Sequence, residues 1–442
     1  MMLINRHKSA SKFPKNTVRE IAFLVRLLIQ MKILNIHKKG RVVFIFILSA
    51  IVLLELYFLI FLRQKVLIGN IASETDLQKY ARQVQDKCKG SNYKASCYDR
   101  EIPKLMDYIS MEDAFNVTKI IQKTDDQYKY CHVLGHKLSG REMQKDPSKW
   151  KDIIARCPAT MCNNGCLHGP LLARFNNETL TDSQIEKIMP DLKSICEPRA
   201  GWKPSSLEIS VCYHGLGHLN MYITGANVQK SVDLCYDESI KSDGRNYQQT
   251  CIQGIFMQIY QPLEPEDVAL IKNIRQTKET VEQFCAQFTG DAFSACHNES
   301  WPLFRKEIEK SEGLTKFCTF SDDEMEQRKC FSNTLGYLTT YYVIDSISID
   351  KLTNFCMGLR PQNRGNCFGD AAMRMMQIDP SYRNTALKIC ENAHSLSGDC
   401  YRALASYAPV LFADGSKEFV SYCKLLPQPY QKQCLNKEIK MH

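Results

Sequence analysis

The stretch from Cys356 to Cys400 reads CMGLRPQNRGNCFGDAAMRMMQIDPSYRNTALKICENAHSLSGDC, and it holds the unit from which the fold is built. Two cysteines flank a turn-like segment, LRPQNRGN, and the second cysteine opens an apolar, helix-like run, CFGDAAMRMMQI. The same order returns with ENAHSLSGD between Cys390 and Cys400. Because Gly, Pro, Asn, Ser and Asp favour turns, we expect the cysteines at the corner of a helical hairpin, where one helix ends and the next begins.

The cysteine pairs recur at a nearly constant interval. The first cysteines of the last five pairs are residues 285, 318, 356, 390 and 423, so the steps are 33, 38, 34 and 33 residues. A period near 34 is typical of helix–turn–helix repeats, and alternating strand patterns are scarce. The sequence therefore predicts an all-α fold of disulfide-stapled helix–turn–helix repeats, an α-solenoid in which strong curvature is allowed.

All 20 cysteines lie at or after residue 88, and their even number indicates a disulfide framework formed in an oxidising compartment. Nine pairs are 9–16 positions apart: Cys88 with Cys97, Cys157 with Cys166, Cys196 with Cys212, Cys235 with Cys251, Cys285 with Cys296, Cys318 with Cys330, Cys356 with Cys367, Cys390 with Cys400, and Cys423 with Cys434. Cys131 and Cys162 remain and could bridge each other. An alternative is a zinc site formed by Cys157, Cys162, Cys166 and His168, although structural zinc sites usually have closer cysteine spacing.

This arrangement over residues 88–442 resembles the cysteine-rich helical-hairpin repeat proteins of the tetratricopeptide-like superfamily, in which a disulfide also staples neighbouring helices of each repeat. The resemblance concerns architecture alone and supplies no functional residue. It implies a scaffold or a peptide-binding surface and, in some members, a claimed enzymatic role. An array of this kind should stand as one cooperative unit, because no single repeat buries its apolar face alone.

The N-terminal part of the chain predicts a membrane anchor. Residues 42–62, VVFIFILSAIVLLELYFLIFL, form an apolar run of 21 residues, which is long enough to cross a bilayer as a helix. Residues 1–41 carry ten Lys or Arg and one acid, so the positive-inside rule keeps this tail in the cytoplasm. We therefore expect a single-pass signal anchor at the cell membrane with the rest of the chain outside the cytoplasm. That remainder divides into a stalk at 63–87, histidine-bearing repeats at 88–234 and C-terminal repeats at 235–442.

Charge and motifs exclude several classes of function. After residue 62 the chain has 47 basic and 46 acidic residues, which leaves no electrostatic footprint for nucleic acid. No P-loop, no G-x-G-x-x-G and no G-x-S-x-G nucleophile elbow occurs.

Five of the ten histidines fall in three related segments and are the candidate metal ligands. The segments are Cys131-His132-Val-Leu-Gly-His136, Gly165-Cys166-Leu-His168-Gly169 and Cys212-Tyr-His214-Gly-Leu-Gly-His218. Histidines four residues apart share one face of a helix and can chelate one divalent ion. Neutral imidazole suits zinc, copper and iron alike, so the metal stays unidentified. The flanking glycines would let another helix or a substrate approach closely.

How these five side chains combine is open at this point. Packed helices lie about 8–10 Å apart, so a single metal reaches all five only if the array curves sharply. Two sites, or one site with the other histidines lining a cleft, are equal alternatives. Glu142 and Glu208 are the nearby carboxylates. The next repeat has Gln253 where the preceding two have histidine, which suggests that histidine is not needed merely to build the repeat.

Two functions follow as hypotheses, and the sequence does not decide whether the protein is an enzyme. One is a metal-binding or metal-dependent catalytic site at the five histidines, which predicts that they converge in a pocket. The other is a non-enzymatic scaffold for peptides or proteins, in which the histidines are dispersed and individually hydrogen-bonded. Its groove could include Phe331, Tyr341 and Tyr342, although core packing is the more usual role of such residues.

Overall fold

The structure is a computed structural model that describes residues 72–125, 127–159, 161–175, 178–345, 348–413 and 415–436. The chain divides into two compact units, of which the second, Ile71–His442, contains all of these residues. The predicted cytoplasmic tail and the anchor at 42–62 lie outside them. Among the described residues, no helix combines the length and apolar character that a membrane crossing requires.

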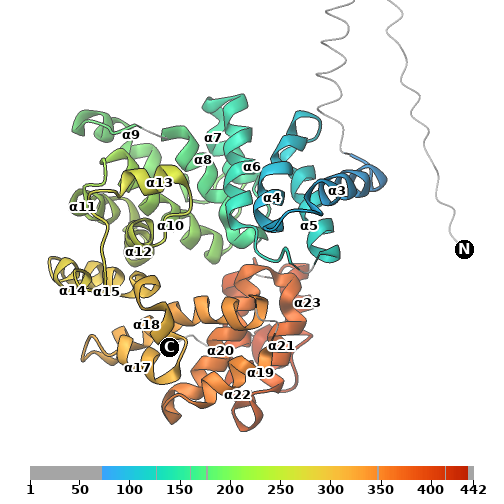
Figure 1. Ribbon diagram of the computed structural model, residues 1–442, viewed down its shortest axis with the longest axis vertical. Coiled ribbons are helices and arrows are strands. Elements are labelled where there is room, and N and C mark those ends of the chain that lie inside the picture. Colours follow the sequence, from blue (N-terminus) through green and yellow to red (C-terminus); the bar gives the residue numbers. More distant parts are fainter. Residues whose placement is uncertain are drawn as a thin grey trace, which may run out of the picture. The chain divides into compact units, whose positions relative to one another are not determined.

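The second unit is all-helical in its described part, as predicted, and its helices follow one another as hairpins (Figure 1). The N-terminal half contains α3 (Glu74–Cys88), α4 (Lys94–Glu101), α5 (Met111–Thr124), α6 (His132–Lys145), α7 (Trp150–Arg156), α8 (Gly165–Phe175), α9 (Asp182–Ile195), α10 (Ser206–Ile223), α11 (Val228–Ser239), α12 (Gln248–Tyr260) and α13 (Pro265–Leu270). The C-terminal half contains α14 (Val281–Cys285), α15 (Gly290–Glu299), α16 (Arg305–Ile308), α17 (Ser311–Phe317), α18 (Glu324–Thr339), α19 (Ile349–Met357), α20 (Pro361–Ile378), α21 (Arg383–Glu391), α22 (Ser397–Leu411), α23 (Lys417–Cys423) and α24 (Tyr430–Asn436).

Hydroxyl side chains define where several of these helices begin. Ser73, Ser110 and Ser416 each accept a hydrogen bond from a backbone N–H in the first turn of the helix that follows. Thr181 and Ser205 form complete capping boxes at the starts of α9 and α10. These caps satisfy backbone donors that have no partner inside the helix.

All ten predicted disulfides are present, and none of the cysteines is free. Nine of them close the corner between two consecutive helices, as from α3 to α4 and from α21 to α22. The alternative zinc site is wrong, because Cys157, Cys162 and Cys166 are all consumed by disulfides.

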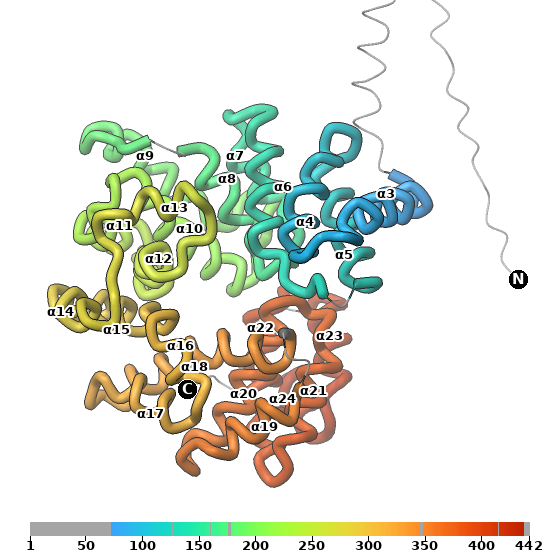
Figure 2. Tube along the Cα trace, viewed as in Figure 1, coloured from blue at the N-terminus to red at the C-terminus, as the bar shows by residue number. Residues whose placement is uncertain are grey.

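The second helices of the hairpins form a continuous inner row, whose path is clear in Figure 2. In this row α6 packs on α8, α8 on α10, α10 on α12, and α12 on α15; α15 then contacts α18, and α18, α20, α22 and α24 continue the row. The array curves back on itself, since α20 contacts the 3-10 turn η4 (Met161–Asn164) and α22 contacts α10. The hydroxyl of Tyr382 also donates to the carbonyl of Lys129 at 3.3 Å. The curvature that the sequence allowed is therefore realised.

Two predictions are corrected by the helix boundaries. Helix α3 lies mostly within the segment expected to be a stalk, and its Leu77, Ala81 and Val84 side chains are buried in the core because they share one face of the helix. The second cysteines also do not open their helices: α20 begins at Pro361, so most of the segment LRPQNRGN that was expected to be a turn is helical, and the third histidine segment likewise lies inside its helix. The capping box at Ser205 starts α10 more than a turn before Cys212.

The apolar core divides between two clusters of buried residues. One extends from Leu77 to Cys296 and the other from Ile308 to Cys434, with Phe304 partly buried against both. Phe331 and Tyr342 belong to the second cluster, and the Tyr342 hydroxyl donates to the carbonyl of Glu309. These aromatic residues therefore pack in the core, which leaves little of them to line a groove.

Candidate metal centre

The five histidines converge, and they are called the histidine centre from here on: His132 and His136 on α6, His168 on α8, and His214 and His218 on α10. The ring centroids of His132, His136 and His168 lie 4.6–5.3 Å apart. His168 also lies 5.8 Å from His214 and 5.7 Å from His218, which are 4.9 Å from each other. His168 thus stands between two pairs spaced by four residues.

Close helix packing brings the rings together. A Cβ atom added to Gly135 on α6 would lie 2.7 Å from the backbone nitrogen of Cys166 on α8. A Cβ atom on Gly215 would lie 2.7 Å from Cδ2 of His168. Any larger residue at these positions would push the helices apart, so the glycines flanking the histidines set the spacing, as the sequence indicated.

His132, His136 and His168 form the group best suited to hold one ion, and they are called the triad from here on. One ligand nitrogen from each lies within 4.8 Å of the others. The Nε2 atoms of His132 and His136 are 3.1 Å apart. In a tetrahedral zinc site with Zn–N bonds of about 2.0–2.1 Å, ligand nitrogens lie about 3.3 Å apart. This pair is therefore close to the spacing that chelation requires.

In His132 and His168, a hydrogen bond to a backbone carbonyl group determines which ring nitrogen is free to bind a metal. Nδ1 of His132 donates to the carbonyl of Asn163 at 3.2 Å, which leaves Nε2 as the ligand atom. Nε2 of His168 donates to the carbonyl of Val211 at 3.1 Å, and its Nδ1 is buried without a partner. Such backbone contacts commonly orient metal-binding histidines. The Nδ1 atom of His168 therefore has a buried lone pair without a partner, which destabilises the folded state unless a metal ion or a hydrogen-bond donor binds it.

The disulfide Cys131–Cys162 supports this geometry directly. Unlike the nine corner disulfides, it joins the first residue before α6 to the turn η4, with a Cα–Cα distance of 4.6 Å. Cys162, Asn163 and Asn164 all have positive φ, at 53°, 48° and 56°, a conformation that non-glycine residues adopt rarely. The strained turn presents the Asn163 carbonyl to His132.

Burial keeps all five imidazoles neutral. It lowers the pKa of His132 to about 4, with a further contribution from the charge of His218. It lowers the pKa of His136, His168 and His214 well below the ordinary value, and that of His218 in the same direction. Metal binding requires the unprotonated ring, so these histidines are ready to coordinate at neutral pH.

The second pair is held by helix α12. Nδ1 of His218 donates to Oε1 of Gln258 at 2.6 Å, and Nε2 of His214 lies 3.2 Å from Sδ of Met257. Met257 has the same place in its repeat as His218 has in the preceding one, six residues after the second cysteine. The positions of Met257 and Gln258 in their repeat could therefore have identified them from the sequence as neighbours of His214 and His218.

A cleft of about 650 Å³ opens onto the histidine centre. His132, His168 and His214 line it, together with Gln253 and with residues from α18 and α20 such as Tyr337 and Arg374. Sequence reasoning missed this second set of residues, because the curvature of the array brings them to the histidines from far along the chain.

Among the cleft residues, Glu299 carries a buried carboxyl group. It accepts hydrogen bonds from Nε2 of Gln261 at 2.8 Å and Nδ2 of Asn333 at 2.9 Å. Burial raises the pKa of Glu299 to about 7.

The two carboxylates named from the sequence are engaged elsewhere. Glu142 accepts a hydrogen bond from Arg156 at 2.9 Å and pairs with Lys145. Glu208 closes the capping box of α10 through the backbone N–H of Ser205.

No family model, curated protein or solved structure matches this chain.

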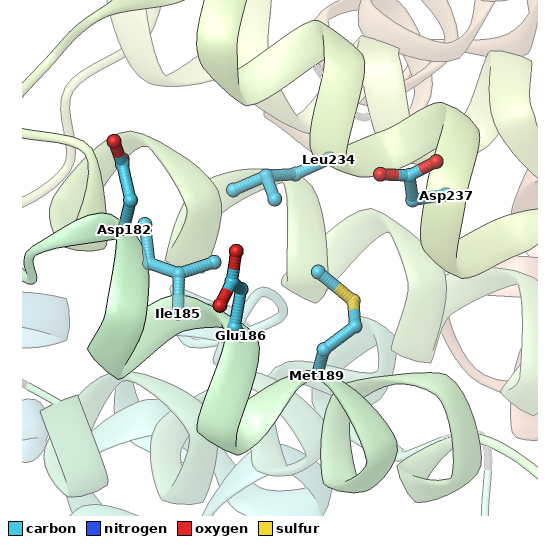
Figure 3. A pocket seen from close by; sticks show the side chains of 6 residues that line it. All are labelled: Asp182, Ile185, Glu186, Met189, Leu234 and Asp237. Carbon is cyan, nitrogen blue, oxygen red and sulfur yellow. The ribbon is translucent and has the colours of Figure 1, made fainter.

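A second hollow, of about 300 Å³, lies between α9 and α11 (Figure 3). Its lining consists of three carboxylates around three apolar side chains: Asp182, Glu186, Asp237, Ile185, Met189 and Leu234. Asp182 already pairs with Lys230. None of the residues expected to bind metal lines this hollow.

Proposed function

We propose that this protein is an extracytoplasmic metalloprotein, tethered to the cell membrane by residues 42–62, in which the triad binds a divalent transition metal that acts on a substrate in the cleft. The observation that carries the proposal is the geometry of the triad: one ligand nitrogen from each imidazole lies within 4.8 Å of the others, and Nδ1 of His168 is buried without a partner. The ten disulfides support a location in an oxidising compartment.

A metal held by three histidines would keep a fourth position for water or for a substrate group, as catalytic zinc sites do. Because His132 and His168 line the cleft, that position would be accessible from it. The metal would act there as a Lewis acid. His214, which also lines the cleft, is placed to accept a proton or to extend the ligand set.

The scaffold hypothesis required dispersed histidines, and the convergence of the five rings favours the metal hypothesis instead. Both hypotheses share the cleft, so peptide or protein binding stays the alternative. The resemblance to tetratricopeptide-like repeat proteins supports an architecture that can present such a cleft.

The test is elemental analysis of the full chain, purified with its disulfides intact, beside a His132→Ala/His136→Ala variant. We expect close to one transition metal per chain in the parent and none in the variant. His297→Ala is the matched control, since His297 also follows a cysteine directly and lies outside the histidine centre, stacked on Phe320 at 4.0 Å. Circular dichroism checks that each variant is folded. A parent that binds no metal even after incubation with zinc, copper, iron or nickel salts would contradict the proposal.

A further inference from the structure

Helix α20 contributes Arg374 to the cleft, and the bonding of this side chain is incomplete. Its Nη1 donates to Oε1 of Gln377 at 3.3 Å, while its Nε is buried and has no partner. In the described part of the chain, no carboxylate forms an ion pair with Arg374. A partly buried guanidinium normally pairs with an anion, because an isolated charge is costly to remove from water.

The acidic residues that share the cleft are already occupied. Asp370 accepts hydrogen bonds from both terminal nitrogens of Arg328, at 2.5 and 2.8 Å. Glu299 accepts from two amide groups and, with its raised pKa, is largely protonated below pH 7. Arg374 therefore lacks an internal counterion, although a protein carboxylate lies only one helical turn away at Asp370.

The position of Arg374 is defined by packing. A Cβ atom on Gly336 of α18 would lie 3.4 Å from Nε and 3.6 Å from Cδ of Arg374, so the side chain lies along α18 where glycine leaves room for it. Helix α20 also contacts the turn η4, whose Asn163 orients His132. Arg374, His132 and His214 line the same cleft. The guanidinium thus acts on the same space as the histidine centre.

We infer that the cleft binds a substrate carrying an oxyanion, a carboxylate or a phosphate, which Arg374 holds while another part of the same molecule faces the histidine centre. The planar guanidinium suits both oxyanions, which it binds through paired hydrogen bonds. Neutral amides such as Gln253 and Gln377 line the remainder of the cleft and can bond uncharged parts of the substrate. The orientation toward a metal rests on the proposed function, whereas the oxyanion site at Arg374 does not.

The experiment is equilibrium dialysis of the full chain against radiolabelled inorganic phosphate and, separately, labelled acetate. Each is measured on protein stripped of metal and on protein loaded with zinc. We expect at least one of the two anions to bind the stripped protein, and Arg374→Gln to weaken that binding by tenfold or more. Arg374→Lys, which keeps the charge and loses the planar fork, should fall between them. Preference for phosphate or acetate identifies the oxyanion.

Arg402→Gln is the matched control, because Arg402 lies on the next inner helix, is largely exposed and pairs with Asp399. It should bind either anion as the parent does. Equal binding by the parent and Arg374→Gln, or no binding of either anion by either form of the parent, would overturn the inference. If no metal loads but Arg374→Gln still abolishes anion binding, the proposed function fails and the oxyanion site stands.

Discussion

The repeats of α8 and α10, which carry three of the five histidines, and the C-terminal repeats, α18 to α22, have the same disulfide-closed corner and different residues after it. Two positions beyond the second cysteine, the successive repeats from α8 to α22 have His168, His214, Gln253, Asn298, Ser332, Gly369 and Arg402. The hairpin forms with all of these residues. The difference teaches that the histidines are not required to build a repeat, since the later repeats form the same disulfide-closed hairpin without them.

Replacing the central histidine, His168, should give the largest difference in zinc affinity between a substitution in the histidine region and one in the C-terminal region. His168→Asn removes the ligand that lies between the two histidine pairs, and we expect the affinity for zinc to fall by 100-fold or more. Ser332→Asn, at the same register position in the C-terminal repeats, should leave the affinity unchanged. Competition titration with a chromophoric chelator measures both. Similar losses in the two variants would mean that the triad is not the binding site.

Removing a disulfide separates stability from metal binding. Cys390→Ala/Cys400→Ala opens an ordinary corner and should lower the free energy of unfolding by about 2–4 kcal/mol, with no effect on metal affinity. Cys131→Ala/Cys162→Ala should cost a similar amount and also weaken metal binding, because it releases the turn that orients His132. Urea unfolding and metal titration of both variants test this. Unchanged metal affinity in the second variant would argue against a role for the turn.

Replacing a buried acid by its neutral amide should have opposite effects on stability at pH 8 in the two regions. Oε2 of Glu238 accepts a hydrogen bond from Asn220, Oε1 has no partner, and burial raises the pKa to about 8 from 4.5. Between these two pH values the folded protein holds a proton on Glu238 that the unfolded chain has released. The stability that this proton contributes is fully present below pH 4.5 and is lost as the pH rises to 8. The slope of this contribution is about 1.4 kcal/mol per pH unit at most.

Glu238→Gln should therefore be more stable than the parent at pH 8 and lose that advantage at pH 5. Asp370→Asn in the C-terminal region should be less stable at both pH values, because it leaves Arg328 without its counterion. Urea unfolding at pH 5, 6.5 and 8 measures the free energies. A difference in stability between the parent and Glu238→Gln that does not change over this range would show that Glu238 is ionised in the folded state.

Two glycine substitutions, one in each region, should give the smallest difference in metal binding. Gly215→Ala forces His168 to move, and Gly369→Ala meets Cβ of Ala403 at 2.8 Å. Each should cost about 1–2 kcal/mol through overpacking, and only Gly215→Ala should also weaken metal binding. Thermal unfolding with and without zinc distinguishes them. An equal increase in melting temperature on adding zinc would show that the spacing around His168 is not critical.

The fold could be predicted from the sequence because its signals are local. The interval between cysteines and the apolar run after the second cysteine lie within one repeat, whereas the turn between the cysteines is shorter than predicted, since α20 begins at Pro361. Cys131 and Cys162 were the two cysteines left over, and they form the tenth disulfide. The two departures also have local causes. Ser205 caps α10 early, and the apolar face of α3 at Leu77 and Ala81 draws the expected stalk into the core.

The candidate site could be predicted only in part. The five histidines were identified because their spacing is encoded along the chain, and their convergence required only that neighbouring inner helices pack closely. The residues that complete the cleft, above all Arg374, could not be identified from spacing, because they depend on the total curvature of the array. Curvature accumulates from many small packing angles between helices, and no single residue encodes it.

The bond between Cys131 and Cys162 has a consequence for where the protein would acquire the proposed metal. Under reducing conditions the turn bearing Asn163 is not fastened to the start of α6, so the carbonyl that orients His132 is not held in place. If the triad binds metal as proposed, its geometry is therefore completed only where the cysteines can be oxidised. Since imidazole ligands discriminate poorly between zinc, copper and iron, the supply of metal in that compartment would then select the ion.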